Sequence, residues 1–243
     1  MKTYFFIPAN NQRFIENLQL VTQKLEKFVR IGFNSNTSFQ YLDTLLKLGF
    51  VNFVLPKIES LSALLLIRNY VAERAENFKL ILLIESPKAL MNLPELIQVD
   101  EVTSIGLGSH DYCDIMNMEH IHANYDWANK YILNYAKAFG KEAIDVVSMN
   151  IEDESKLKAE FLNSASSGFD AKFFIHPIQL KVFYELNFIS PEELELAIKV
   201  RDYVISIGGV ENFGILKLQG RVIEKPHLDR FRKILNEKNH EGF

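Results

Sequence analysis

Short hydrophobic runs alternate with amphipathic stretches along almost the whole chain. Runs of aliphatic and aromatic residues begin near residues 4, 27, 51, 80, 103, 144 and 171. Each is short and bounded by Pro, Gly or polar residues, which predicts strands buried on both faces, as in a parallel sheet. Between the runs, apolar residues recur at helical spacing. This regular alternation predicts an α/β fold with a parallel sheet, although the pattern does not place the eighth strand of a closed barrel.

The pattern changes after residue 189. Ser190-Pro191-Glu192-Glu193 is a helix start with a capping box, and the predicted helix runs to about Ser206. Gly208-Gly209 breaks it, residues 213–220 predict a β-ribbon, and residues 227–235 predict a last helix. None of this is needed to close a barrel that ends at His176. We therefore divide the chain into a barrel at 1–189 and a C-terminal tail or lid segment at 190–243.

Composition narrows the class of protein. The 243 residues carry a net charge of -4 and no basic block, which argues against a nucleic-acid partner. No run approaches the roughly 20 apolar residues that cross a membrane, and the N-terminal run is too short for a secretory signal. Cys113 is the one cysteine, which suits a reducing compartment. These features predict a cytoplasmic protein with a core large enough for one domain, like the (β/α) barrels of about 250 residues.

Two carboxylates follow neighbouring predicted strands. Glu85 ends the run at residues 80–84, and Asp111 follows the run that contains Gly106 and Gly108. The carboxyl ends of parallel strands meet at one edge of the sheet, where ligands bind. Oxygen ligands with open positions suit Mg²⁺, and the two glycines let the backbone approach a ligand closely. Either Glu85 and Asp111 hold this cation, or they are two unrelated loop acids.

The order of short motifs resembles the citrate lyase β-subunit-like family, which belongs to the same superfamily as malyl-CoA lyases and HpcH-type aldolases. The motifs are colinear over nearly the whole chain. They comprise Phe6-Ile7-Pro8-Ala9-Asn10, Val29-Arg30-Ile31, Val54-Leu55-Pro56-Lys57-Ile58-Glu59, Ile84-Glu85-Ser86, Gly106-Leu107-Gly108 with Asp111, Ala143-Ile144-Asp145, Gly168-Phe169-Asp170-Ala171-Lys172, Ile175-His176-Pro177, and Gly220-Arg221-Val222-Ile223-Glu224-Lys225-Pro226.

The resemblance implies a Mg²⁺-dependent carbon–carbon lyase on a TIM-type (β/α) barrel. By position, Glu85 and Asp111 would be the Mg²⁺ ligands, and Arg30 would bind a carbonyl or carboxylate oxygen of the substrate. The backbone at Gly108 would contact the substrate carboxylate. Glu224 would act as acid or base at the site of a neighbouring subunit. The implied partners are a small oxoacid or acyl-CoA substrate and further copies of the chain, a trimer being usual in the family.

Three departures from the family's pattern change the expectation. The strand and acidic motif that usually precede the Arg30 strand are missing, because only residues 14–27 are available there. Gly32-Phe33 separates Arg30 from the asparagine that usually follows closely. Glu224 stands where an aspartate is usual. We therefore predict a barrel that lacks or replaces one βα unit, and two functions remain open: an active lyase, or a non-catalytic member that binds metal or ligand or forms complexes.

Other residues have alternative interpretations. Arg30 either binds substrate or pairs with a neighbouring acid, and Lys57 either contacts substrate or pairs with Glu59. His176 fixes a turn or acts as a base, with the turn favoured. His120 and His122 are interpreted as solvated loop residues. Asp145, placed at a strand start, is interpreted as structural. The tail either reaches over a neighbouring barrel or packs on its own.

Overall fold

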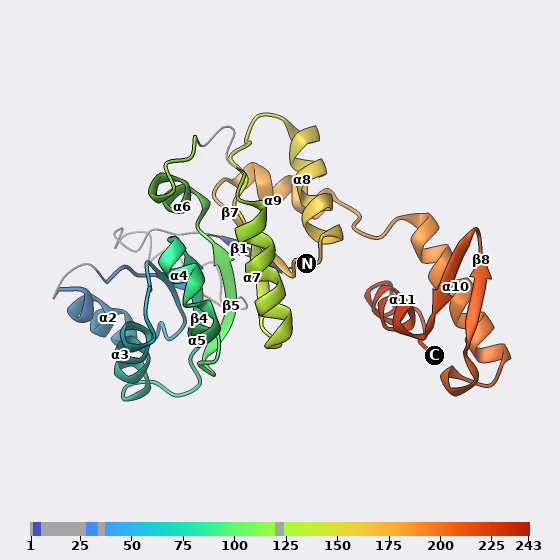
Figure 1. Cartoon of the computed structure of the whole chain (residues 1–243), viewed down its shortest axis with the longest axis horizontal. Helices are drawn as coiled ribbons and strands as arrows, with labels where there is room; N and C mark the ends of the chain where they lie inside the picture. Colours follow the sequence, from blue (N-terminus) through green and yellow to red (C-terminus); the bar gives the residue numbers. More distant parts are fainter. Residues whose placement is uncertain (1, 6–27, 34–36, 120–123) are drawn as a thin grey trace. The chain divides into compact units, whose positions relative to one another are not determined.

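The computed structural model describes residues 2–5, 28–33, 37–119 and 124–243. The chain separates into two compact units, Met1–Glu185 and Leu186–Phe243, shown in Figure 1. No helix among the described residues has the length and apolar character needed to cross a membrane. Residues 9–26, for which we predict no regular strand, and His120 and His122 lie outside the described residues.

The first unit is built on a seven-stranded sheet in which every pairing is parallel. Its strands are β1 (Lys2–Phe5), β2 (Val29–Arg30), β3 (Phe53–Pro56), β4 (Leu80–Ile84), β5 (Val102–Leu107), β6 (Glu142–Asp145) and β7 (Ala171–Phe174). All seven predicted strands are present. For the strands that the structure describes, the order β1-β7-β6-β5-β4-β3-β2 is that of a (β/α) barrel in which β1 and β2 do not pair. The predicted TIM-type barrel without one βα unit is thus confirmed.

Helices follow the strands and lie outside the curled sheet (Figure 1). They are α2 (Thr37–Lys47), α3 (Leu61–Ala72), α4 (Pro87–Met91), α5 (Leu93–Leu96), α6 (Ser109–Ile115), α7 (Asp126–Ala138), α8 (Glu154–Ser166) and α9 (Pro177–Glu185). Gly49, at φ +84°, follows α2 and lets the chain turn there. The segment around Pro94 forms two short helices instead of one, because proline cannot continue a helix. The helix α3 ends at Ala72, where a polar turn follows.

The two faces of the sheet have separate cores, because side chains alternate along each strand. One set packs with the helices and includes Phe53, Leu55, Leu80, Leu82 and Ile105. The other set fills the inside of the curled sheet and consists of Val54, Ile81, Leu83, Ile144, Ala171 and Phe173. Gly106 belongs to this inner layer: a β-carbon there would lie 2.7 Å from Cε2 of Phe173. The glycine therefore makes room for the aromatic ring.

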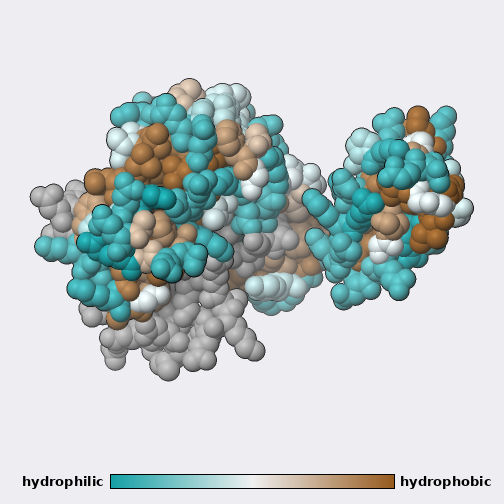
Figure 2. Space-filling view, turned by 90° about the horizontal axis from the view of Figure 1, so that it is seen from below, coloured by the Kyte–Doolittle hydropathy of each residue, from teal (hydrophilic) through white to brown (hydrophobic). Residues whose placement is uncertain are grey.

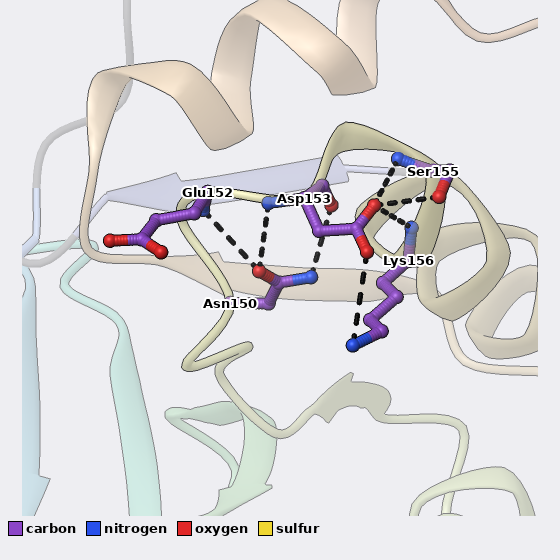
Figure 3. A network of polar contacts seen from close by, with 5 residues as sticks. All are labelled: Asn150, Glu152, Asp153, Ser155 and Lys156. Carbon is purple, nitrogen blue, oxygen red and sulfur yellow. Dashed lines mark hydrogen bonds and ion pairs between the residues drawn. The ribbon is translucent and has the colours of Figure 1, made fainter.

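Side-chain caps fix the loops at the carboxyl edge of β6 and β7. Figure 3 shows Asn150 Oδ1 accepting from the Asp153 N–H, and Asp153 Oδ1 accepting from the N–H groups of Ser155 and Lys156 at the start of α8. The buried Gln179 donates to the carbonyl of Ser148 and accepts from the N–H of Ile175. These bonds join the loop after β6 to the loop after β7 and hold the rim of the inner layer.

The second unit has its own core. It contains α10 (Pro191–Ser206), the 3₁₀ turn η1 (Val210–Asn212), the antiparallel pair β8 (Ile215–Leu218) and β9 (Arg221–Glu224), and α11 (Lys225–Glu237). The predicted helix, glycine break, ribbon and final helix are all present. Ser190 Oγ caps α10 by accepting from the N–H of Glu193. The Glu193 carboxylate pairs with Arg230, so the predicted reciprocal bond of the capping box is replaced by a link to α11.

Candidate functional site

Three of the predicted site residues come together at the carboxyl end of the inner layer. Val54, Leu83 and Gly106 face inward, so strand alternation also directs Arg30, Glu85 and Gly108 inward. Arg30 ends β2, while Glu85 and Gly108 directly follow β4 and β5. Arg30 Nη2 lies 3.2 Å from Glu85 Oε1. The arginine therefore does pair with an acid, and that acid is the predicted metal ligand.

Glu85 is a buried carboxylate with unused bonding capacity. Its side chain is 3% exposed, and Oε1 accepts from Arg30. Oε2 is buried and has no hydrogen-bond partner among the residues that the structure describes. Burial raises the pKa of Glu85 above its ordinary value; the charge of Arg30 opposes this shift and that of Asp111 adds to it. A buried oxygen without a partner is costly, which indicates that a cation or proton belongs beside Oε2.

Gly108 lies directly against Glu85. The Gly108 N–H donates to the carbonyl of Ile84 at 2.8 Å, which brings the two residues side by side. A β-carbon at position 108 would be 2.4 Å from Cγ of Glu85 and 3.0 Å from Oε1. The need for glycine here is thus steric, because the Glu85 side chain occupies the space that a β-carbon at position 108 would fill.

Asp111 and Lys57 form the second ion pair of the site. Lys57 Nζ lies 2.8 Å from Asp111 Oδ1, and this contact raises the pKa of Lys57. Asp111 lies in the first turn of α6, the helix that follows β5, and not at the end of the strand itself. The suggested pairing of Lys57 with Glu59 is wrong. Glu59 instead accepts from Ser86 and pairs with Lys88.

The backbone of Lys57 explains why sequence reasoning missed its partner. Lys57 directly follows Pro56, the last residue of β3, and has φ +57°, a left-handed conformation that is rare for a residue with a side chain. Such conformations persist where the surrounding structure fixes them, and they cluster at functional sites. No signal in the sequence marks a lysine for this conformation.

Asp145 belongs to a separate buried cluster. It is the last residue of β6, so its predicted position at a strand start is wrong. Its carboxylate accepts from Lys172 Nζ at 2.7 Å, from Asn129 Nδ2 at 2.8 Å and from Ser164 Oγ. Asn129 and Ser164 belong to α7 and α8. This cluster therefore ties two helices to the outer face of the sheet, away from the inward-facing Arg30 and Glu85.

Two further predicted residues have local contacts. His176 is exposed, and its Nδ1 accepts from the N–H of Ile178, as expected for a residue that fixes a turn. Glu224 is exposed in the second unit, where it is the N-cap of α11. Its N–H donates to His227 Nδ1 at 2.9 Å. The Glu224 carboxylate is thus carried on the turn between the ribbon and the last helix.

The residues present fit a hard divalent cation. Glu85 offers a buried oxygen with no hydrogen-bond partner among the described residues, and Asp111 offers a second carboxylate whose charge raises the pKa of Glu85. Gly108 leaves room for the Glu85 side chain at this position. No cluster of three or more His, Cys, Asp or Glu suited to a metal occurs among the residues that the structure describes. Two carboxylates with the remaining positions left to water and substrate are typical of Mg²⁺.

This fold and site define a (β/α)-barrel protein with a carboxylate pair at the carboxyl end of its strands. The sequence profile of the HpcH/HpaI aldolase/citrate lyase family matches residues 5–177, and the chain belongs to this family.

Individual relatives agree with the family assignment. The citrate lyase subunit beta of Escherichia coli K12 is 26% identical over 162 residues, which cover 65% of this chain and 53% of that protein. The chain thus spans about half the length of this relative. The mitochondrial citramalyl-CoA lyase of Rattus norvegicus is 31% identical over 111 residues, 45% of this chain and 32% of that protein.

A solved structure supports the fold. The CitE protein of Mycobacterium tuberculosis, crystallised with magnesium, acetoacetate and coenzyme A, superposes with a TM-score of 0.77. It is 23% identical, and the match covers 98% of each chain. At this identity the comparison bears on the fold, and it extends over both units of this protein.

Proposed function

We propose that this protein is a Mg²⁺-dependent carbon–carbon lyase that cleaves or forms a small hydroxy- or keto-acid, as the free acid or as a CoA thioester. The observation that carries the proposal is the convergence of Arg30, Glu85 and Gly108 around a buried carboxylate whose Oε2 has no hydrogen-bond partner among the described residues. The names of the relatives, citrate lyase subunit beta and citramalyl-CoA lyase, give the reaction class.

The proposed chemistry assigns a role to each group. Cleavage of a β-hydroxy acid takes a proton from the hydroxyl, breaks the adjacent carbon–carbon bond and leaves an electron pair as an enolate, which then takes up a proton. Mg²⁺ held by Glu85 and Asp111 would polarise the oxygen where charge develops. Arg30 would donate to the same oxygen and never loses its charge. The Gly108 backbone and Lys57 would hold the carboxylate, and Glu224 would move the proton.

The proposal includes self-association. Glu224 lies in the second unit, and the ribbon that carries it exposes Ile215 (64%) and Val222 (52%). Figure 2 shows hydrophobic residues at the surface of the second unit as well as of the first. Exposed apolar residues beside a proposed proton-transfer group favour a tail that covers the site of a neighbouring copy in a homo-oligomer, as in the trimers of the resembled family.

A turnover screen tests the activity. Malyl-CoA, citramalyl-CoA, citryl-CoA and free oxoacids would be incubated with the full chain, with and without Mg²⁺, and products separated by chromatography. We expect cleavage of at least one compound that stops when EDTA removes the metal. Exchange of the methyl protons of pyruvate and acetyl-CoA with D₂O, followed by NMR, reports enolate formation without requiring the right complete substrate.

A second candidate is a non-catalytic subunit that binds metal and ligand. The sequence between Pro8 and Arg30 favours it, because the acidic motif usual in the family is missing there. Binding of Mg²⁺ and pyruvate without proton exchange, and without turnover in the screen, would favour this role over the lyase.

A further inference from the structure

The four charged groups of the site form one cluster that is balanced in charge. Arg30 pairs with Glu85 and Lys57 pairs with Asp111, so two positive charges face two negative ones. Among the described residues, the charges that act on Glu85 are those of Arg30, Asp111 and Lys57, and those that act on Lys57 are those of Asp111, Glu85 and Arg30. The two pairs therefore respond to each other's charge.

The two pairs differ in freedom. Glu85 is 3% exposed, so its carboxylate is fixed within the protein. Lys57 and Asp111 have side chains 55% and 39% exposed. A lysine side chain is a flexible stem with a compact charge, and an exposed ion pair contributes little to stability. A lysine in such a pair can therefore change partner at low cost. Arg30 is 41% exposed but is bound to the fixed carboxylate of Glu85, so Lys57, in the pair that is exposed at both ends, is the cation with more freedom to change partner.

Binding of a divalent cation to this cluster is unfavourable in charge. With Lys57 on Asp111, the cluster is neutral, and Mg²⁺ alone would leave it with two uncompensated positive charges. Lys57 also occupies Oδ1 of the carboxylate that the metal needs. A substrate carboxylate relieves both problems, because it brings negative charge and offers Lys57 another partner.

On this basis we propose that Lys57 couples the binding of metal to the binding of an acidic substrate: it holds Asp111 in the empty site and transfers to the substrate carboxylate when Mg²⁺ takes its place. The inference rests on the proposed function. It adds that tight binding of the metal depends on the oxoacid substrate. Mg²⁺ binds weakly alone and tightly with the oxoacid. Because coupling is reciprocal, the oxoacid gains from Mg²⁺ the same factor that Mg²⁺ gains from the oxoacid.

Isothermal titration of the full chain with MgCl₂, with and without saturating pyruvate, tests the coupling. We expect pyruvate to tighten Mg²⁺ binding about tenfold or more in the unmodified protein. In Lys57→Gln, Mg²⁺ alone should bind about tenfold more tightly, and the effect of pyruvate should fall towards none. Lys57→Arg should keep the coupling. Lys88→Gln is the matched control, because Lys88 pairs with Glu59 and should leave both values unchanged.

The outcomes separate this inference from the proposed function. Mg²⁺ binding that pyruvate does not change in the unmodified protein overturns the coupling and leaves the metal site intact. Weaker Mg²⁺ binding in Lys57→Gln also overturns it, since Lys57 would then support Asp111 in the metal-bound state. No Mg²⁺ binding under any condition overturns the metal site itself and the inference with it.

Discussion

Gly108 and Glu85 are so close that position 108 has no room for a side chain: a β-carbon there would lie 2.4 Å from Cγ of Glu85. Gly108→Ala should push the carboxylate from its position and weaken Mg²⁺ binding about tenfold or more, with the fold retained. Titration calorimetry with pyruvate present measures this. Gly214→Ala is the control, because a β-carbon there meets nothing within 4 Å. Equal Mg²⁺ affinity in both variants would show that the position of Glu85 is unimportant.

Gly106→Ala should have a different effect. Its β-carbon would meet Cε2 of Phe173 at 2.7 Å, inside the inner layer rather than at the site. Overpacking of this kind costs about 1–3 kcal/mol of the free energy of unfolding. Urea denaturation should show that loss, while Mg²⁺ affinity of the folded protein changes little. A strong loss of metal binding at unchanged stability would contradict the assignment.

Removal of either proposed ligand tests the metal site directly. Glu85→Gln and Asp111→Asn keep the size of each side chain but remove its charge, so each should abolish measurable Mg²⁺ binding. Circular dichroism would confirm that the fold remains. Glu59→Gln is the control, because Glu59 is an acid at a neighbouring strand end whose partners are Ser86 and Lys88. Tight Mg²⁺ binding in both ligand variants would remove these residues from the site.

The buried pair of Asp145 and Lys172 should matter for stability and not for metal binding. Both side chains are largely buried, and Lys172→Met would leave the carboxylate without its cation. Breaking a buried ion pair costs about 3–5 kcal/mol. Asp145→Asn/Lys172→Met removes both charges and should recover part of that loss. Chemical denaturation of the two single variants and the double variant measures the coupling.

The same pair predicts a pH dependence. Burial would raise the pKa of Asp145, but Lys172, Ser164 and Asn129 together outweigh it and hold the pKa below its ordinary value. The folded state therefore binds this proton less readily than the unfolded state. The stabilisation is fully present above the ordinary aspartate pKa of about 4 and is lost as the pH falls below it. Asp145→Asn should flatten the acid limb of the stability curve, and an unchanged limb would exclude this group as its cause.

Shared sites predict complementation between two inactive variants. Arg30→Ala should lower kcat/KM by about 10²–10³-fold, and Glu224→Gln should also impair turnover. If each site takes Arg30 from one chain and Glu224 from the next, an equal mixture that exchanges subunits in a cyclic assembly restores about a quarter of the sites. Light scattering would establish the assembly. A mixture no more active than its components would place both residues of a site in one chain.

The sequence predicts the strands well because each is a short apolar run closed by a breaker, and a buried parallel strand needs nothing else. It predicts their ends less well. Val146 and Val147 continue the apolar run of β6, but both pack in the core after the strand has ended at Asp145. Apolar residues indicate that a segment is buried. The position at which a strand ends depends on its last hydrogen bond to the neighbouring strand, which the apolar pattern does not contain. For this reason the apolar run predicts Asp145 at the start of the strand, whereas it is the last residue of β6.

In the candidate site, too, the sequence predicts some features and not others. Glu85 and Gly108 lie together because strand alternation and parallel register bring them together, and the sequence contains both patterns. The partner of Lys57 depends on a left-handed backbone and on the first turn of α6, which are tertiary features. In the sequence, the nearest acidic partner for Lys57 is Glu59, two positions away. In the structure the Glu59 carboxylate instead accepts from Ser86 and pairs with Lys88.

Cys113 offers a practical consequence. It is the one cysteine of the chain, it is 1% exposed in α6, and burial raises the pKa of its thiol. Maleimide reagents attack exposed thiolates, so the native chain should remain unlabelled. One cysteine introduced on each unit, for example by Ser62→Cys and Ser206→Cys, would then accept a pair of fluorophores without further sequence changes. Energy transfer between them would report whether the distance between the two units changes when metal and oxoacid bind.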